Sequence, residues 1–249
     1  MCLIGFMINE HPEYPFIFAS NRDEFYSRET KQAGEWEGLP GLIAGKDVEK
    51  GGTWLGLTMS GDFAALTNVR EPTADSEGKQ SRGELVKSYF ENREVFNSNL
   101  EHASVYGGFN IIYGNVRQLN YFSNRAELKA SLTNGVHALS NAALNTPWPK
   151  TEQLKAGMKE LVSVHSSSEL EENLFTLLKA DQAFPVEQLP DTGVGTELER
   201  MLSPLFISSD QYGTRSSTVV LVDKYDNCTF VERSYVPSAA EARFTFKIV

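Results

Sequence analysis

"ASNRDEFYSRET", residues 19–30, is the stretch that decides the fold, and it follows directly on the apolar run at residues 16–18. Five of its side chains are charged: Arg22, Asp23, Glu24, Arg28 and Glu29. A strand that leaves a hydrophobic core does not normally carry three charged residues in a row. Because Cys2 stands at the start of the same chain, we expect this charge cluster to meet the N-terminus.

The chain has 249 residues, 41% hydrophobic residues and a formal net charge of −10. This length is typical of one domain, which we assign to residues 1–249. The acidic balance argues against nucleic acid and anionic membranes as partners, since both call for a basic face. The N-terminal apolar stretch stops at Asn9, and no run of eighteen apolar residues occurs. We therefore expect a cytoplasmic protein without an integral membrane segment.

The order of the expected elements predicts an α+β fold with mostly antiparallel sheets. Apolar runs at 2–8 and 16–20 read as strands around a Pro-containing turn, and 53–70 reads as a hairpin that turns at Ser60-Gly61. The segment between them, 44–54, reads as a polar loop. Further strands are expected at 107–114, 118–123, 135–141, 216–223, 228–235 and 242–249. Helices are expected at 81–90, 150–164 and 169–180, the first with a capping box at Ser81 and Glu84 and the last with one at Ser168 and Glu171.

Cys2 is the first candidate for chemistry. Removal of Met1 would place a thiol and a free α-amine on one residue, and an α-amine has an ordinary pKa near ~8. Such an amine can take the proton of its own thiol, so the nucleophile needs no histidine. The alternative is that Cys2 is a small apolar residue in a strand. With only Cys2 and Cys228 in the chain, no disulfide framework is expected.

The other candidates are the groups that such a nucleophile requires. An antiparallel return of the second strand would bring Asp23 beside Cys2, where a carboxylate holds the ammonium form of the amine, while Arg22 or Arg28 would favour the thiolate. Asn68 and Asn141, at strand ends, offer amide donors for an oxyanion, and Arg215 enters a late strand. Each candidate also has a structural alternative. The charged motif around Asp23 would be a solvated turn, Asn68 and Asn141 would be turn or cap residues, and Arg215 would form a surface ion pair.

Several motifs together resemble the NRDE-domain family, also called the transport and Golgi organisation protein 2 family. They run in order along nearly the whole chain: "MCLIGF", "ASNRDEFYSR", "AGKD", "GGTWLGLT", "ALTNVR", "SRGELV", "HALSNAALNTPWPK" and "YGTRSSTVVLV". This family is similar to the N-terminal nucleophile (Ntn) hydrolases of the branch with bile-salt hydrolase, penicillin V acylase and acid ceramidase. The resemblance implies a four-layer α-β-β-α sandwich, with Cys2 as the nucleophile.

The same resemblance implies roles for the other site residues. The Arg-Asn-x-Asp segment of that branch matches "SNRD" at Asn21 and Asp23, while Ser20 occupies its Arg position and Arg22 is a spatial substitute. Its Thr-Asn-Ser-Pro segment matches at Asn141. Asn68 and Arg215 fall where an oxyanion donor and a late active-site arginine are expected.

Three functions are consistent with these residues. The first is an N-terminal cysteine amidohydrolase that acts on a small-molecule amide and requires no cofactor; retention of Met1 would switch it off. The second, suggested by the family's link to haem trafficking, is a non-catalytic haem carrier with His137, His102 or a thiolate as the iron ligand. The third is a scaffold that retains the fold without chemistry.

Overall fold

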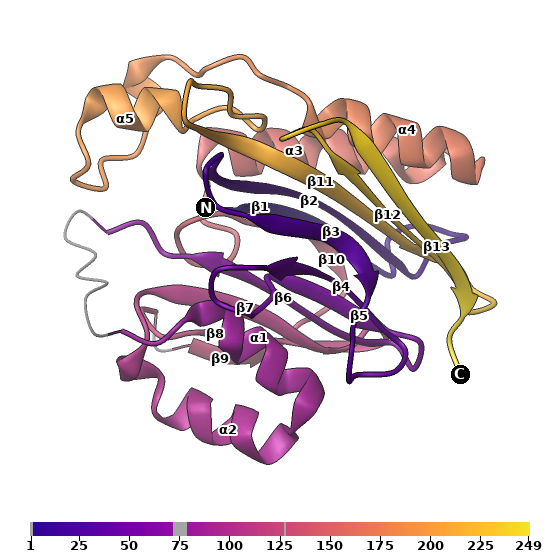
Figure 1. Cartoon of the computed structure of the whole chain (residues 1–249). Coiled ribbons are helices and arrows are strands. Elements are labelled where there is room, and N and C mark those ends of the chain that lie inside the picture. Colours follow the sequence, from indigo (N-terminus) through magenta and orange to yellow (C-terminus); the bar gives the residue numbers. More distant parts are fainter. Residues whose placement is uncertain (1, 72–78, 127) are drawn as a thin grey trace.

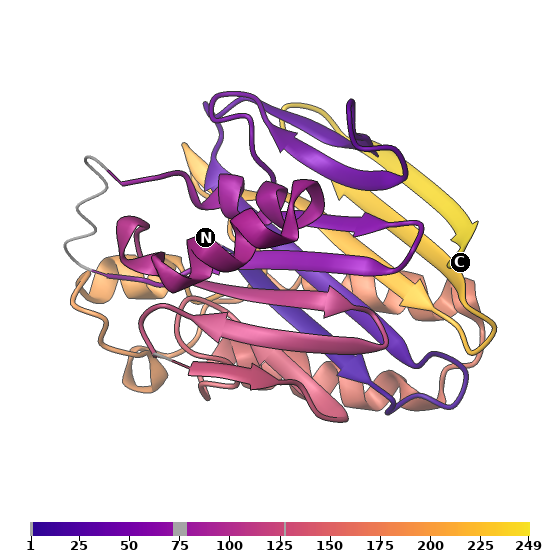
Figure 2. The same cartoon turned by 90° about the horizontal axis from the view of Figure 1, so that it is seen from below.

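Two antiparallel sheets form the centre of the molecule in this computed structural model, which describes residues 2–71, 79–126 and 128–249 (Figure 1). Sheet A contains, in spatial order, β10 (Gly135–Leu139), β1 (Cys2–Ile8), β2 (Phe16–Phe25), β11 (Tyr212–Val222), β12 (Asn227–Ser234) and β13 (Ala240–Lys247). Sheet B contains β3 (Thr30–Glu35), β4 (Leu42–Asp47), β5 (Leu55–Thr58), β6 (Asp62–Asn68), β7 (Phe109–Asn115), β8 (Gln118–Ser123) and β9 (Leu128–Ser131). The strands of the two sheets cross when the molecule is seen from below (Figure 2).

Helices cover the outer face of each sheet, which makes four layers (Figure 1). The helices α3 (Pro149–Glu160) and α4 (Ser167–Leu178) pack on sheet A, and α1 (Arg82–Glu91) and α2 (Arg93–Glu101) lie on sheet B. A short helix, α5 (Thr196–Met201), follows residues 181–195, an irregular segment that contains the 3-10 helix Val186–Gln188. None of the helices among the described residues is long and apolar enough to cross a membrane.

Each interface between layers has its own hydrophobic core. Alternate side chains of β1 enter different cores: Ile4 and Phe6 lie between the sheets, while Leu3 and Met7 face α3 and α4. A third core joins sheet B to α1 and α2. Because β1 is buried on both faces, it reads as a continuous apolar run rather than an alternating one.

The predicted α+β fold with antiparallel sheets is confirmed, but some boundaries were wrong. The second strand continues to Phe25, so the charged motif lies within β2 and not in a turn beyond it. The expected loop at 44–54 begins with the last residues of β4. Ser81 precedes α1 but its side chain makes no capping bond, and α4 is capped by Ser166 instead of Ser168. The strands β3, β4 and β9 and the helices α2 and α5 were not predicted.

Candidate active site

The register of sheet A brings the charged motif back to the start of the chain. In the antiparallel ladder between β1 and β2, Cys2 is paired with Arg22, so Asp23 is the next residue beyond the pair. On the other side of β2, Asp23 is paired with Thr214 of β11. The β2–β11 ladder shifts register between Thr214 and Ser216, which leaves Arg215 in a bulge. The return that the sequence predicts is therefore observed in the backbone.

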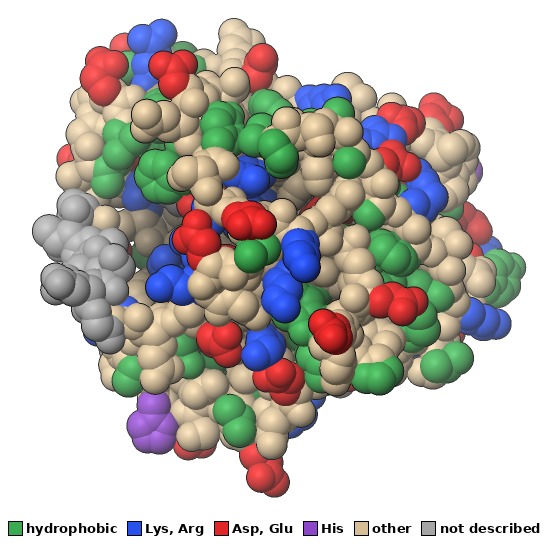
Figure 3. Space-filling model, viewed as in Figure 1, with side chains coloured by type: hydrophobic (Ala, Val, Ile, Leu, Met, Phe, Trp, Pro, Cys, Tyr) green, Lys and Arg blue, Asp and Glu red, His purple; other side chains and the backbone are tan. Residues whose placement is uncertain are grey.

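Cys2 opens onto a cavity of about 910 Å³, a size within the usual range for small-molecule sites. Its lining combines charged and apolar side chains. The charged ones are Arg22, Asp23, Glu24, Arg28, Asp47, Lys50, Glu71, Lys79, Arg82 and Arg125, and the apolar or aromatic ones are Phe25, Trp54, Leu66, Leu198, Met201, Leu202 and Tyr212. In the space-filling view, basic and acidic side chains surround the hollow on the left of this face (Figure 3).

The Cys2 thiol is partly exposed, yet its surroundings hold back ionisation. Burial raises its pKa, and the nearby Asp23 charge raises it further. The Arg22 charge and a hydrogen bond from the Asp23 backbone N–H lower the pKa of Cys2, but by less than burial raises it. Arg22 acts in the predicted direction and favours the thiolate, but desolvation exceeds its effect, so the net pKa of Cys2 is raised. At neutral pH Cys2 is a thiol, and a base must remove its proton before it can attack.

Asp23 is the next residue after the β2 partner of Cys2 and is 1% exposed. Its Oδ1 accepts a hydrogen bond of 2.7 Å from the Thr214 hydroxyl. Burial raises the pKa of Asp23 above its ordinary value, and the positive charges of Lys150 and Arg22 and the Thr214 bond offset this rise only in part. A buried carboxyl whose ionisation depends on neighbouring cations is typical of functional sites.

Arg22 projects into the cavity from the opposite face of β2 to Asn21. Its guanidinium lies 4.1 Å from the centre of the Trp54 ring, and its Nη1 has no hydrogen-bond partner among the described residues. Gly45 makes this arrangement possible, since a Cβ there would lie 2.4 Å from the Trp54 ring. By contrast, Arg28 donates from Nε and Nη2 to Asp47 at 2.8 and 2.6 Å, so it fixes the loop after β2.

The two asparagines contact each other but have different surroundings. Asn68 ends β6 and lines the cavity. Asn141 is 1% exposed, and its Nδ2 donates a 2.8 Å hydrogen bond to the backbone carbonyl of Asn68. It is not among the residues that line the cavity. Asn141 therefore anchors the strand end that carries Asn68.

Arg215 and Asn21 fix the two ends of the motif from outside the cavity. Arg215 Nη1 donates to the backbone carbonyls of Phe25 and Tyr26 at 2.9 and 2.6 Å, and this residue does not line the cavity. Asn21 Nδ2 donates to the carbonyls of Leu178 and Leu205 at 2.8 and 2.7 Å. Asn21 thus joins β2 to the helical layer, and Arg215 holds the end of β2 in place.

Comparison with known proteins is consistent with the motifs. The profile of the family "Transport and Golgi organisation 2" matches residues 1–237. The chain belongs to this family. It is 36% identical to the transport and Golgi organization protein 2 homolog of Homo sapiens, over 94% of this chain and 93% of that protein. It is 34% identical to the homolog of Mus musculus, with the same shares covered.

The fold of this transport and Golgi organisation 2 family member is that of an Ntn hydrolase. The solved structure of the Caenorhabditis elegans N-acylethanolamine-hydrolyzing acid amidase ortholog superposes with a TM-score of 0.53. The match covers 88% of this chain and 92% of that chain, at 12% sequence identity. The predicted four-layer sandwich is confirmed by this likeness, which concerns the fold alone.

Sequence reasoning missed a second group of buried charges, made up of Arg70, Glu199 and Lys150. Arg70, just after β6, forms an ion pair with Glu199 of α5, and both side chains are at least 95% buried. Lys150, the second residue of α3, is 3% exposed and lines a small pocket together with Arg70 and Glu199. The signal was available in part, because "ALTNVR" and "NTPWPK" are both among the segments that resemble the family. Their charged last residues were not singled out.

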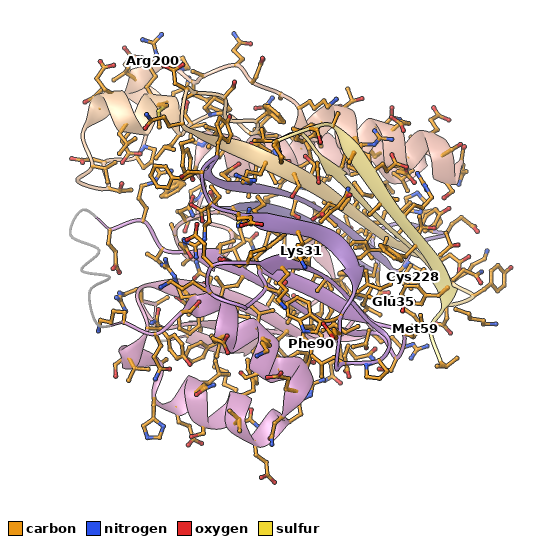
Figure 4. The ribbon with its side chains drawn as sticks, in the orientation of Figure 1. Lys31, Glu35, Met59, Phe90, Arg200 and Cys228 are labelled. Atoms are coloured by element: carbon orange, nitrogen blue, oxygen red, sulfur yellow. The ribbon has the colours of Figure 1, made fainter. Side chains whose placement is uncertain are left out.

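The residues considered for haem lie away from Cys2. His137 stacks on Phe6 at 5.0 Å and is bonded to Thr133 and Asn145, and His102 follows α2 at the surface; neither lines the cavity. Cys228 is buried, and a comparison of Figure 1, which marks the N-terminus, with Figure 4, which labels Cys228, shows that the two lie at opposite ends of sheet A. Met1 lies outside the described residues.

Proposed function

We propose that this protein is an N-terminal cysteine amidohydrolase that cleaves a C–N bond in a small-molecule amide. The observation that carries the proposal is the position of Cys2, at the first residue of β1, open to a 910 Å³ cavity and adjacent to the buried Asp23. The likeness to an amidase with the same fold supports it. A reducing compartment, such as the predicted cytoplasm, would keep Cys2 as a thiol.

In the proposed reaction, the α-amine of Cys2, freed by removal of Met1, takes the proton of the thiol. The sulfur attacks the amide carbonyl carbon and forms a C–S bond, and the carbonyl electrons move to the oxygen. As the C–N bond breaks, the ammonium gives its proton to the leaving amine, and a thioester remains. Water, deprotonated by the same amine, then attacks the thioester and releases a carboxylic acid and the thiol. A base is required in the first step because the pKa of the Cys2 thiol is raised.

Asn68 is the proposed donor for the developing oxyanion. It lines the cavity with Cys2, and an aimed amide N–H stabilises such a charge. We assign Asn141 a supporting role, because its side-chain amide already donates to the Asn68 carbonyl. Asp23 holds the ammonium form that appears between the two proton transfers.

The charges of the lining favour an amide that also bears a carboxylate. Arg28 and Arg125 are already paired with Asp47 and Glu71. Arg22 is different, because its Nη1 lacks a hydrogen-bond partner among the described residues and a guanidinium binds carboxylates well. Leu66 and Leu198, among other apolar lining residues, provide a surface for an acyl chain. N-acyl amino acids combine these features.

The free α-amine is the requirement that can be tested most directly. Intact-mass measurement of the purified protein should show the loss of Met1, and the processed protein should hydrolyse members of an N-acyl amino acid panel, followed by liquid chromatography and mass spectrometry. Insertion of one glycine between Met1 and Cys2 keeps the thiol but converts its amine into a peptide. We expect this variant to lose about 10²–10⁴-fold in rate, the contribution of a positioned general base.

A glycine added after Val249 is the matched control, since this residue is 91% exposed. It should leave the rate unchanged. Fully processed wild-type protein without activity on the whole panel, or a glycine-insertion variant with the wild-type rate, would contradict the proposal.

Haem binding is the second candidate, favoured by the size of the cavity and by the presence of one thiol in its lining. Since His102 and His137 lie elsewhere, Cys2 is the axial ligand that this function would use. If it holds, micromolar hemin should give a shifted Soret band with the wild-type protein and not with Cys2→Ala. An unchanged Soret band with the wild-type protein would remove this candidate.

A further inference from the structure

A second pocket, much smaller than the cavity at Cys2, shares one wall with it, because Leu202 lines both. Its volume is about 10 Å³, which is room for one particle of the size of a water molecule. Arg70, Lys150 and Glu199 contribute charged side chains to its lining, and most of the other lining residues are apolar or aromatic. The pocket is therefore a small charged site in apolar surroundings.

Arg70 brings hydrogen-bond donors to this pocket that have no protein acceptor. Its side chain is 5% exposed, and its Nη1 donates to the Glu199 carboxylate. Its Nε and Nη2 are buried and have no hydrogen-bond partner among the described residues. Because N–H groups of a buried cation are costly to leave without an acceptor, we expect an acceptor to occupy the pocket that Arg70 lines.

Lys150 adds a positive charge that the protein does not pair. It is 3% exposed, and its Nζ donates a 3.0 Å hydrogen bond to the Leu202 carbonyl, which carries no formal charge. The Glu199 carboxylate accepts instead from Arg70 Nη1 and from the backbone N–H and hydroxyl of Thr192. Two cations and one carboxylate leave the pocket lining with a formal charge of +1.

The start of α3 adds to the positive potential. Trp148 is the N-cap of this twelve-residue helix, Pro149 and Lys150 are its first two residues, and all three line the pocket. The Trp148 side chain makes no capping hydrogen bond. The N-terminal end of a helix dipole attracts anions and repels cations, so a lysine at this position is favourable only beside a negative charge.

We propose that this pocket is a binding site for one monatomic anion, such as chloride, held by Arg70 Nε and Nη2 and by the charge of Lys150. The small volume excludes carboxylate and phosphate groups. A water molecule would accept the hydrogen bonds of Arg70 but would leave the buried positive charge unbalanced, whereas a chloride ion meets both needs. The anion would join the strand end after β6, the start of α3 and the segment after α5. The site is independent of the proposed hydrolase chemistry.

Chloride should stabilise the folded protein in a saturable manner. At constant ionic strength and pH 7, replacement of sodium gluconate by sodium chloride should raise the melting temperature by about 3–6 °C once chloride reaches ten times its dissociation constant. Sodium bromide should act as sodium chloride does. Screening of surface charges depends on ionic strength and so is the same in both salts. Differential scanning calorimetry of the full-length protein measures the shift.

Two variants assign the effect to the pocket. Arg70→Lys keeps a cation beside Glu199 but removes the Nε and Nη2 donors, so it should lose most of the rise caused by chloride. Arg117→Lys is the matched control, because Arg117 pairs with Asp226 at the surface, and it should keep the full rise. An equal melting temperature of the wild type in gluconate and in chloride would overturn the site. A full chloride effect in Arg70→Lys would overturn it as well.

Bromide in crystals of the wild-type protein gives a test that needs no variant, and it decides the matter if Arg70→Lys does not fold. We expect an anomalous-scattering peak within hydrogen-bond distance of the Arg70 guanidinium in crystals grown with sodium bromide. A water molecule at that position, without an anomalous peak, would overturn the site. None of these measurements uses hydrolysis of N-acyl amino acids, so failure of the proposed function and failure of the anion site are distinguished.

Discussion

Cys2→Ala is expected to reduce the hydrolysis of N-acyl amino acids by about 10⁴-fold or more, the effect of removing the nucleophile in enzymes of comparable chemistry. The sulfur forms the bond to the acyl carbon in the proposed reaction, and no other cysteine lines the described part of the cavity. The loss should appear in kcat, since the alanine leaves Arg22 and the apolar lining in place to bind the substrate. Initial rates measured by mass spectrometry over a range of substrate concentrations separate kcat from KM.

The matched control for this variant is Cys228→Ala. Cys228 is 1% exposed within the core between the sheets, and burial raises the pKa of its thiol to about 12. Its replacement should leave kcat within about twofold, because the proposed chemistry does not use it. Circular dichroism should show that Cys2→Ala folds as the wild type does. Wild-type turnover by folded Cys2→Ala would remove the hydrolase proposal and leave the fold.

Arg70→Leu is expected to destabilise the protein by about 3–5 kcal/mol, because it leaves the Glu199 carboxylate buried without its partner. The pair joins the strand end after β6 to α5, and the Arg70 guanidinium also stacks over Trp148 at 5.0 Å. Since Leu198 and Met201 of α5 line the cavity, the same variant should weaken substrate binding. Urea unfolding followed by tryptophan fluorescence measures the free energy of unfolding.

Two further variants test whether the loss of stability comes from the buried ion pair. Arg70→Leu combined with Glu199→Leu should recover part of the loss, because it removes both charges. The matched control is Arg117→Leu, which breaks the exposed pair with Asp226 and should cost less than about 1 kcal/mol. If Arg70→Leu lowers the free energy of unfolding by no more than Arg117→Leu does, the buried pair does not hold α5 to the strand end.

The parts of the site that lie on strands consecutive along the chain were predictable from the sequence. Two apolar runs separated by a proline-containing turn favour an antiparallel pair, and the lengths of those runs bring Asp23 back to Cys2. The end of β6 at Asn68 follows in the same way from the hairpin signal at Ser60-Gly61.

The remaining parts depend on packing between distant segments, for which a single sequence has no pattern. Arg70, Lys150 and Glu199 come from a strand end and from two helices, and nothing in their spacing indicates that they meet. The raised pKa of Cys2 depends on how far the folded chain excludes water from its sulfur, which residue types alone do not reveal. For Arg215, the bulge in β11 directs the guanidinium to the carbonyls of Phe25 and Tyr26.

The ladder between β1 and β2 also sets the position of the N-terminus. Ile8 is paired with Phe16 at one end of this ladder and Cys2 with Arg22 at the other, so the seven residues of β1 fix how far the sulfur reaches. One residue more or fewer would displace it by about 3.3 Å along the strand and turn it to the other face of the sheet. Insertions are therefore tolerable in the surface turns of this protein but not within its first strand, because the number of residues in that strand sets where the Cys2 sulfur lies.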